Sequence, residues 1–494
     1  MGGDKLKILF ASSEVAPLSK TGGLADVSGS LPKAIKSLGH DVRVVTPFYK
    51  MAKKMAKSTK KVINRLNVPV SDRQVPASVE MTQLDGSVPV YLIKKDSYFS
   101  RDELYTTRQG DYKDNAERFV FFSRAILEML KHIDFKPDII HCNDWQTGLI
   151  PAYLKILYSN QNGFQDIKSI FTIHNLGYQG IFWALDMHLT NLPWDIFTMD
   201  GIEFYGNISF LKAGLVYADT LTTVSKGYSK EIQTQEYGLG MEGILQKRQK
   251  DLYGIVNGAD YDHWSPENDP YIVASYDKTN LENKTKCKLD LLQEFGLKAK
   301  PTTPIIGLIS RLADQKGFDI LAESMNDLMK MDLIFILLGT GDQKYQELFT
   351  NISDKYPKKT GIRMAFDNAL AHKIEAGSDM YLMPSKYEPC GLNQIYSLKY
   401  GSIPIVRATG GLDDTITDIH ADPRRGNGFK FSEYTSKALI STVKRAIEYY
   451  AHKEAWAQLV WKAMAIEFSW EKSAREYLKL YQETIKKRSL TLVS

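Results

Sequence analysis

The chain has 494 residues, of which 43% are apolar and 24% are charged, the composition of an ordinary globular protein. Its net charge of +5 is too small an excess of Lys and Arg to indicate a nucleic-acid partner. This length exceeds one ordinary core, so two domains are expected, and no uncharged stretch approaches the ~20 residues that would cross a bilayer.

Two features of the sequence indicate the compartment. The chain has three cysteines, Cys142, Cys287 and Cys390. A small and odd number of cysteines does not indicate a disulfide framework and suits a reducing cytoplasm. The apolar stretch near the N-terminus is too short for a signal peptide and ends at Glu14. We therefore expect a cytoplasmic protein.

Short β-rich runs alternate with helical patterns along the first half of the chain, which predicts a parallel sheet covered by helices. A helix is predicted at Asn115–His132, with an apolar face formed by Phe119, Phe122, Ile126, Met129 and Leu130. The strand candidates are Leu6–Ser12, Val42–Pro47, Val88–Ile93, Ile139–Cys142, Ser169–His174 and Thr220–Val224.

The densest basic run lies between the second and third of these strands. At helical spacing its lysines fall on one side, so a solvated face is the plainer interpretation and contact with an anionic surface the alternative. The run comprises Lys50, Lys53, Lys54, Lys57, Lys60 and Lys61.

A second series of strands and helices follows a polar stretch, Asp260–Lys300, which is interpreted as the link. Helices are predicted at Phe318–Met329 and Leu392–Tyr400. The strand candidates are Pro304–Ser310, Leu333–Leu338, Arg363–Phe366, Met380–Met383 and Ile403–Val406. The fold class is therefore α/β, with two doubly wound domains at 1–259 and 260–469 and a cleft expected at the carboxyl ends of their strands.

The last segment, 470–494, has the pattern of a helix that packs back on the first domain. Its apolar stripe consists of Trp470, Ala474, Tyr477, Leu478, Tyr481 and Ile485.

The first candidate site follows the first strand and contains Lys20, Gly22, Gly23 and Asp26. Paired glycines let backbone N–H groups approach an anion, a helix start adds a favourable dipole, and Lys20 adds a full charge. A plain tight turn explains the glycines equally well. Pro32 is expected to kink or divide the helix that follows.

A second candidate site, Ser310–Gly317, carries two cations after a strand of the second series. Arg311 and Lys316 lie five residues apart in a loop and can converge on one group, as binding a diphosphate requires. A solvated basic loop is the alternative.

A third candidate site, Tyr387–Asn393, opens a predicted helix near Gly391. Helix-start N–H groups could hold phosphate, and Glu388 could accept hydrogen bonds from sugar hydroxyls. Alternatively, Glu388 satisfies the start of its own helix. Gly410 and Gly411 repeat the strand-then-glycine pattern.

The fourth group, Asn143–Trp145 and His174–Asn175, lies at the ends of two successive strands and is therefore expected on one edge of the sheet. Asp144 could bind a glucose hydroxyl and Trp145 could offer an apolar face, although each is also an ordinary structural residue. The metal and nucleophile motifs HExxH, CxxC and GxSxG are absent, and KTGGLADVSG breaks the GxGxxG spacing of a dinucleotide-binding dehydrogenase.

Taken together, these segments resemble the bacterial glycogen synthases and plant starch synthases, a family with the two-domain GT-B fold. The resemblance runs through KILFASSEVAPLSKTGGLADVSGSLPKAI, HCNDWQTGLIPAYLK, TIHNLGYQG, VNGADYDHWSP, SRLADQKGFDIL and PSKYEPCGLNQIYSLKYG, nearly the whole chain. Asn393 departs from the family pattern, which often has Thr there, and this leaves the detailed phosphate contact open.

The resemblance implies a role for each candidate. It assigns Asp144, His174, Arg311, Lys316 and Glu388 to catalysis, with the His174 main-chain carbonyl giving electrostatic help. The residues implied to surround the nucleotide sugar are Lys20, Gly22, Gly23, Asp26, Asn257, Tyr387, Cys390, Gly391, Asn393, Gly410 and Gly411.

The implied reaction transfers glucose from ADP-glucose to the end of glycogen or a malto-oligosaccharide, with retention of configuration and without a metal or other cofactor. Neither nucleic acid nor membrane is implied as a partner, and an oligomer stays open. One alternative is a phosphorylase with lysine-bound pyridoxal phosphate, and a second is a non-enzymatic glucan-binding protein.

Overall fold

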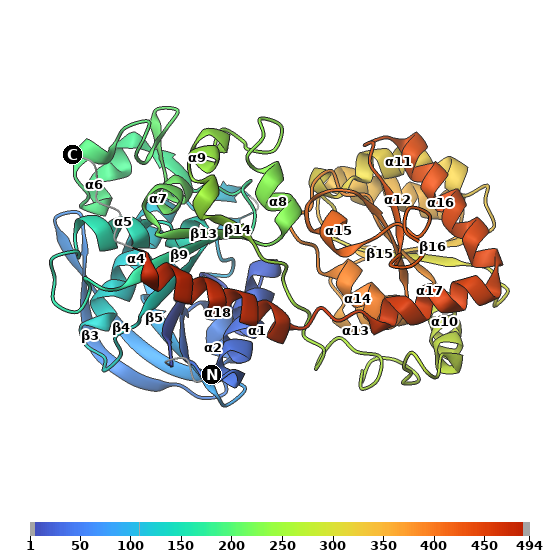
Figure 1. Ribbon diagram of the computed structural model, residues 1–494, viewed down its shortest axis with the longest axis horizontal. Coiled ribbons are helices and arrows are strands. Elements are labelled where there is room, and N and C mark those ends of the chain that lie inside the picture. The colour runs from blue at the N-terminus through green and yellow to red at the C-terminus, as the bar shows by residue number, and fades with distance from the viewer. Residues whose placement is uncertain (1–4, 108, 488–494) are drawn as a thin grey trace. The chain divides into compact units, whose positions relative to one another are not determined.

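The computed structural model describes residues 5–107 and 109–487, which fold as two compact units. Unit 1 comprises Met1–Val224, Ser229–Gly258 and Trp470–Ser494, and unit 2 comprises Ser225–Tyr228 and Ala259–Ser469 (Figure 1). Of the predicted terminal helix, residues 488–494 lie outside the described part. No helix in the described part is both long and apolar enough to cross a membrane.

The main sheet of unit 1 has nine strands in the order β14-β13-β9-β8-β1-β2-β5-β4-β3. Neighbours from β14 to β5 pair in parallel, whereas β4 pairs antiparallel with both β5 and β3. The strands are β1 (Lys7–Ala11), β2 (Asp41–Pro47), β3 (Lys60–Val70), β4 (Arg73–Leu84), β5 (Val88–Lys94), β8 (Ile139–Asn143), β9 (Lys168–Ile173), β13 (Thr220–Thr223) and β14 (Leu252–Gly254).

All six strands predicted in the first half are confirmed. The long hairpin of β3 and β4 was missed because the basic run before and within it obscures the alternation. The run does not form one helical face: α2 (Lys50–Met55) ends where Ala56 turns extended, and Lys60 and Lys61 begin β3. Lys50 and Lys53 are paired with Asp102 and Asp96.

Two smaller sheets and ten α-helices complete the described part of unit 1, with the first residues of α8 assigned to unit 2. The small strands are β6 (Thr106–Thr107) with β7 (Gly110–Asp111), and β10 (Ile181–Trp183), β12 (Asn207–Ser209) and β11 (Glu203–Phe204). The helices are α1 (Gly23–Ser37), α2, α3 (Asp96–Phe99), α4 (Asn115–Leu130), α5 (Leu149–Ile156), α6 (Met187–Thr190), α7 (Phe210–Tyr217), α8 (Lys226–Glu231), α9 (Glu242–Lys247) and α18 (Trp470–Lys486).

Two of these helices differ from expectation. Pro32 does not divide α1, which runs through it, and Leu31, Pro32 and Ile35 are all buried. Helix α4 is buried nearly all round rather than on one face. Even Arg118 is inside, because carbonyls of Tyr98 and Leu104 accept from its guanidinium and replace water.

Helix α18 covers part of unit 1 by packing on α1 and β9. The predicted stripe is buried at Trp470, Ala474, Tyr477, Leu478 and Tyr481, while Ile485 at its end is exposed. The hydroxyl of Tyr481 lies 2.7 Å from His141 Nδ1, so each of these two buried side chains gives the other a hydrogen-bond partner.

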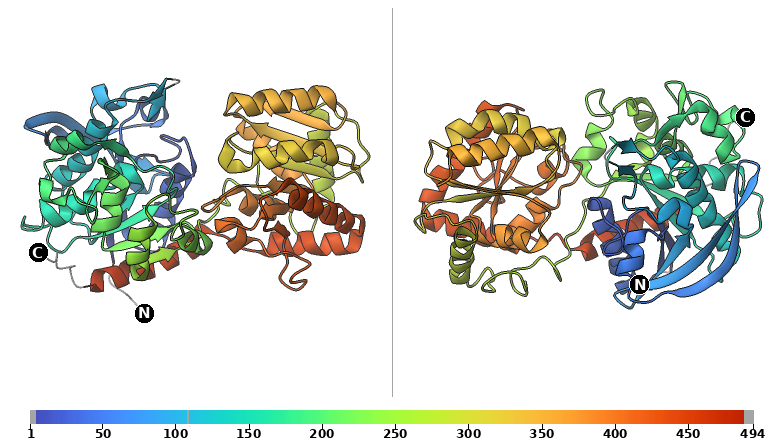
Figure 2. Two further views of the ribbon diagram at one scale, coloured as in Figure 1. Left: turned by 90° about the horizontal axis from the view of Figure 1, so that it is seen from above. Right: turned by 180° about the vertical axis from the view of Figure 1, so that it is seen from behind.

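Unit 2 is built on a six-stranded parallel sheet in the order β17-β16-β15-β18-β19-β20, with helices on both faces (Figure 2). The strands are β15 (Ile305–Ile309), β16 (Ile334–Gly339), β17 (Thr360–Met364), β18 (Met380–Met383), β19 (Ile403–Arg407) and β20 (Phe429–Phe431). The helices are α10 (Glu282–Glu294), α11 (Phe318–Leu328), α12 (Gln343–Lys355), α13 (Asn368–Gly377), α14 (Asn393–Tyr400), α15 (Gly410–Thr415), α16 (Ser436–Ala451) and α17 (Lys453–Ala465).

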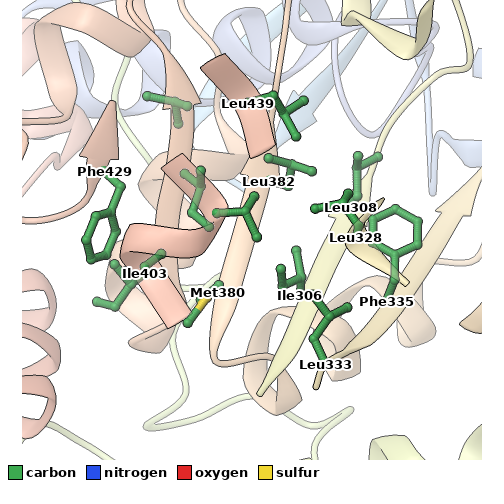
Figure 3. Close-up of a cluster of buried hydrophobic side chains, with 14 of the residues drawn as sticks. Ile306, Leu308, Leu328, Leu333, Phe335, Met380, Leu382, Ile403, Phe429 and Leu439 are labelled. Carbon is green, nitrogen blue, oxygen red and sulfur yellow. The ribbon is translucent and has the colours of Figure 1, made fainter. Parts of the chain in front are cut away.

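The central strands β15, β16 and β18 of unit 2 are apolar along their length, and alternate side chains of β15 and β16 enter two different cores. Ile306 and Phe335 join the larger cluster, part of which is drawn in Figure 3, whereas Ile305 and Ile334 join a second cluster with α10 and α13. All five predicted strands are present, although β17 begins and ends earlier than predicted.

The stretch Asp260–Lys300 is not a simple link, since it belongs to the body of unit 2. Helix α10 packs against α13, and the buried Tyr276 donates to the carbonyl of Tyr400 at 2.8 Å. Trp264 stacks on His372 and Tyr396, with ring centroids 3.8 and 4.3 Å away. The chain leaves unit 1 after Gly258 and returns at Trp470.

Candidate active site

Asp144 and His174 lie together at the carboxyl edge of the unit 1 sheet. Asp144 follows β8 with φ of 56°, a left-handed conformation that non-glycine residues rarely adopt. Its carboxylate accepts the His174 N–H at 2.7 Å and the N–H of Asn175. Burial nevertheless raises the pKa of Asp144 to about 7.

The imidazole of His174 is half-buried and neutral. Burial lowers the pKa of His174 to about 3, and Nε2 lies 2.9 Å from Asn143 Oδ1. Because the Asn143 amide nitrogen donates to the carbonyl of Ala11, its oxygen is the acceptor, and His174 Nε2 carries the proton. His174 is therefore fixed in one tautomer and does not act as a cation.

The glycine turn before α1 is organised by Glu14. Its carboxylate accepts the N–H and hydroxyl of Thr21 at 2.5 and 2.6 Å, the N–H of Gly22 at 3.3 Å, and the hydroxyl of Tyr105 at 3.0 Å. Burial outweighs these bonds and raises the pKa of Glu14. The N–H of Gly22, expected to face an external anion, is thus already bonded within the protein.

The glycines themselves leave open space beside the turn. A Cβ added to Gly22 or Gly23 would meet no atom within 4 Å, and neither residue has a positive φ. The packing of unit 1 therefore does not require glycine at these positions. Lys20 and Asp26, both predicted here, form an exposed ion pair at 2.6 Å.

Asn257 lies near the point where the chain leaves unit 1, far in sequence from the groups described above. It is buried, and its side-chain oxygen has no hydrogen-bond partner in the described structure. The next residue, Gly258, has no room for a Cβ because the Trp470 backbone is 2.5 Å from that position.

Lys316 and Glu388 form the centre of the candidate site in unit 2. Lys316 Nζ lies 2.6 Å from Glu388 Oε2, which also accepts the Ser385 hydroxyl at 3.0 Å. Glu388 is only 5% exposed, so its charge is matched by Lys316 rather than by water. Arg311 lies on the same loop as Lys316, with an exposed side chain.

Backbone contacts hold the Lys316 loop against the Glu388 loop. Gly317 has φ of 75°, and a Cβ there would lie 2.0 Å from the carbonyl of Pro384, so only glycine allows this approach. The Lys386 N–H donates to Gln315 O at 2.8 Å, and the Gln315 side chain donates to Tyr387 O at 3.3 Å.

Gly410 and Gly411 support the same loop from its other side. The Gly411 N–H donates to Glu388 O at 3.1 Å. Added Cβ atoms would lie 2.1 Å from Glu388 O and 2.2 Å from Cys390 O respectively. The glycine pair is therefore required for close packing, and the Gly411 N–H is not left for a phosphate.

The helix predicted at Leu392–Tyr400 is confirmed as α14, which begins at Asn393. Glu388 lies five residues before that start, so the alternative in which it satisfies the start of its own helix does not hold. The amide of Asn393 donates to the carbonyl of Ile309 at 2.9 Å and to the Tyr381 hydroxyl at 2.5 Å, which fixes the end of β15. Gly391 has φ of 71°.

The sequence did not reveal three supporting residues: Glu14, Tyr105 and Ser385. Glu14 and Ser385 follow the ends of strands, and this position could have indicated them. Tyr105 reaches Glu14 from a remote segment that has no recognisable sequence pattern. Within the described residues, no group of three or more His, Cys, Asp or Glu side chains could hold a metal ion.

Comparison with known proteins identifies the family along nearly the whole chain. Residues 7–247 match the family described as starch synthase catalytic domain, and residues 292–459 match glycosyl transferases group 1. A glycogen synthase of Koribacter versatilis is 49% identical over 97% of this chain and 98% of its own length. The chain belongs to the glycogen and starch synthase family.

Further relatives support the same family assignment. A glycogen synthase of Thermosipho africanus is 45% identical over 98% of this chain and 100% of its own. The solved catalytic domain of starch synthase IV from Arabidopsis thaliana, bound to ADP and acarbose, is 32% identical with a TM-score of 0.91, covering 98% and 100% of the two chains.

The fold is therefore GT-B, as predicted, and the enzyme is a glucosyltransferase with glycogen or starch synthase function. A sucrose-phosphate synthase from Thermosynechococcus elongatus, at 17% identity and a TM-score of 0.59, shares the fold.

Proposed function

We propose that this synthase transfers glucose from ADP-glucose to the non-reducing end of an α-1,4-glucan, with retention of configuration and release of ADP. The observation that carries the proposal is the Lys316–Glu388 pair, held between two loops at the carboxyl edge of the unit 2 sheet. The starch synthase IV domain, which binds ADP and acarbose, supports the choice of ADP and of a glucan.

Unit 2 supplies the groups for the donor. Arg311 and Lys316 stabilise the charge that grows on the departing diphosphate, which electrostatic catalysis requires. Glu388 accepts hydrogen bonds from the donor glucose, and Tyr387, Cys390, Gly391 and Gly410 line the same loops. Asn393 and Gly411 act by shaping these loops, since their polar groups are committed within the protein.

Unit 1 supplies an oriented carbonyl. Asp144 accepts the N–H of Asn175, which belongs to the same peptide group as the His174 carbonyl. Because N–H and C=O point in opposite directions in a trans peptide, this bond turns the carbonyl oxygen away from Asp144. A carboxylate on the N–H also polarises the carbonyl, which suits it to a positive charge developing at the anomeric carbon.

Retention then follows from attack by the acceptor O4 on the face that the phosphate leaves. The proton of O4 passes to the departing phosphate oxygen, so no residue forms a bond to glucose. Lys20 and the open space at Gly22 and Gly23 meet the nucleotide sugar. Asp26 pairs with Lys20 between turnovers, and Asn257 is the remaining residue of unit 1 that we assign to the donor site. The enzyme acts in the cytoplasm.

The test is incubation with glycogen and either ADP-glucose or UDP-glucose, measuring release of the nucleoside diphosphate. We expect faster release from ADP-glucose and a product that an α-1,4-specific exo-glucosidase digests. Release of glucose 1-phosphate from glycogen that depends on inorganic phosphate, together with pyridoxal absorbance, would instead identify a phosphorylase. Glycogen binding without release would identify a binding protein.

A further inference from the structure

Gln394, the second residue of α14, reaches back to the loop that carries Glu388. Its side chain is fully buried, and Nε2 donates to the carbonyls of Cys390 and Gly391, both at 3.0 Å. Reversing the amide would set its oxygen against these two carbonyl oxygens, so the nitrogen has to face them. One side chain therefore fixes two successive peptide groups of this loop.

The same amide joins the loop to the glycine pair at Gly410 and Gly411. Nε2 donates to the Thr415 hydroxyl at 3.3 Å, and this hydroxyl donates to Gly411 O at 2.6 Å. The amide oxygen is buried and has no hydrogen-bond partner among the described residues, which costs free energy. A methionine would fill a similar volume without that cost, so core packing alone does not account for a glutamine here.

Gly391 makes room for this contact and sets the conformation of the loop. It has φ of 71°, and a Cβ there would lie 2.4 Å from Gln394 Oε1. Leu392 follows with φ of −119° and ψ of −34°, in the right-handed region. A left-handed residue beside a right-handed one turns successive backbone N–H groups to the same side, which forms a concavity that binds anions.

The two carbonyls that Gln394 holds decide where these N–H groups point. The Cys390 carbonyl shares a peptide group with the Gly391 N–H, and the Gly391 carbonyl shares one with the Leu392 N–H. Because N–H and C=O point in opposite directions in a trans peptide, both N–H groups point away from the Gln394 amide. In the described part of the chain neither N–H donates to a protein acceptor, and both residues are only half-buried. Both donors are therefore available to a ligand.

The place of these donors on the loop identifies the group they meet. Glu388, which accepts hydrogen bonds from the donor glucose in the proposed function, lies three residues before Gly391. The nearest phosphate is then the one bonded to glucose, which becomes the terminal phosphate of ADP. Hydrogen bonds to an ionised oxygen are the strong ones, and this phosphate gains negative charge as its bond to glucose breaks.

We infer that Gln394 is a positioning residue for glucosyl transfer, which aims the Gly391 and Leu392 N–H groups at the departing phosphate without touching the substrate. This rests on the proposed function, in which the donor is ADP-glucose. Without the amide nitrogen, either peptide group can rotate, and its N–H no longer meets the phosphate oxygen. A purely structural role would instead weaken the fold and every nucleotide alike.

The experiment compares the wild type with Gln394→Met, Gln394→Asn and the control Ser402→Ala. Met keeps the volume without the donor, and Asn keeps an amide that is one methylene too short to reach both carbonyls. Ser402 is the matched control, because its buried hydroxyl also donates to two carbonyls, those of Glu375 and Ser378, at 2.6 Å. The readouts are the Kd for ADP and for AMP by calorimetry, kinetics with ADP-glucose and glycogen, and the melting temperature.

In both Gln394 variants we expect the Kd for ADP to rise and kcat to fall, each about tenfold or more, the order of one charge-assisted hydrogen bond. The Kd for AMP and the KM for glycogen are expected to change less than about twofold, because neither ligand has the terminal phosphate. Ser402→Ala should lower the melting temperature but bind ADP as the wild type does.

An unchanged Kd for ADP, equal weakening of ADP and AMP, or the same loss in Ser402→Ala would overturn the inference. Wild-type protein that binds AMP as tightly as ADP would also overturn it, since the terminal phosphate then meets no donor. If Gln394→Met does not fold, Gln394→Asn decides by the same criteria. If the wild type binds ADP but releases none from ADP-glucose, the proposed function fails, while the comparison of ADP with AMP still decides the role of Gln394.

Discussion

At the scale of single residues, Arg311 and Lys316 are the most direct test of the donor site. Replacing either with Ala is expected to lower kcat about 100-fold or more, because a cation aimed at developing negative charge is lost. Neither residue belongs to a core cluster, so the fold persists, but Lys316→Ala leaves the buried Glu388 carboxylate without its cation and is expected to lower the melting temperature. Lys344→Ala is the control, because Lys344 pairs with Asp314 on the same loop yet is 60% exposed. Near-normal turnover in both variants would remove the diphosphate assignment.

Glu388 is tested by Gln, which keeps an oxygen for the Ser385 hydroxyl but removes the charge. We expect kcat to fall at least about 100-fold while circular dichroism stays that of the wild type. We also expect no glucosyl adduct on Glu388 after incubation with a slow donor analogue without acceptor. A mass increase mapped to Glu388 would show double displacement and contradict same-face attack.

Asp144 makes the stability of unit 1 depend on pH. Its folded pKa of about 7 exceeds the ordinary 3.8, so the folded protein binds the extra proton between these values. The contribution of this proton to the free energy of unfolding, up to about 4 kcal/mol, is fully present below about pH 4 and is lost as the pH rises through 7. In Asp144→Asn, the melting temperature of unit 1 is expected to fall less between pH 5 and 8 than in the wild type. The exposed Asp195→Asn should keep the wild-type slope; equal slopes in all three proteins would refute the assignment.

The sequence predicted which residues lie at strand ends, but not where their hydrogen bonds go. Asp144 and His174 were expected on one edge, and the structure joins them. Gly411 and Asn393 were expected to face phosphate, yet their donors serve Glu388 O and Ile309 O. Such partners come from remote segments, so no local pattern encodes them.

At the scale of elements, α1 contains two kinds of glycine. Gly23 has open space around it, whereas a Cβ at Gly29 would lie 2.6 Å from the carbonyl of Ala16. Gly23→Ala is expected to preserve or raise the melting temperature, because Ala favours helix, while kcat/KM for the donor falls at least about tenfold. Gly29→Ala is expected to destabilise unit 1 by roughly 1–3 kcal/mol.

Calorimetry and donor kinetics on the two variants check this contrast. An active Gly23→Ala enzyme would show that the donor does not approach the turn. Destabilisation by Gly23→Ala would show that the open space is not there.

Elements with one regular period were predictable, and the others were not. Strands buried on both faces give unbroken apolar runs, which is why β15, β16 and β18 were found, whereas β17, a partly exposed edge strand, was predicted with displaced bounds. The hairpin of β3 and β4 carries lysines and polar residues on its open side, and α10 lies in a polar stretch, so both were missed. Their assignment depends on packing partners rather than on local pattern.

At the scale of the whole molecule, unit 2 is inserted into unit 1. Unit 1 includes residues on both sides of Ala259–Ser469, and α18 covers α1 and β9. Removing residues 470–494 therefore exposes apolar surface in unit 1 and leaves His141 without the Tyr481 hydroxyl. In a chain ending at residue 469, we expect protease to digest unit 1 while unit 2 resists. Resistance of both units would show that α18 is dispensable.

This insertion reverses the usual order of folding during translation, in which the N-terminal domain is finished first. The ribosome has to synthesise all of Ala259–Ser469 before the stripe of Trp470, Ala474 and Tyr481 emerges and can cover α1 and β9. Until then, the surface that α18 will cover is available to chaperones. Unit 2 matures early, and the unit that holds Asp144 and His174 becomes complete only after α18 has been synthesised.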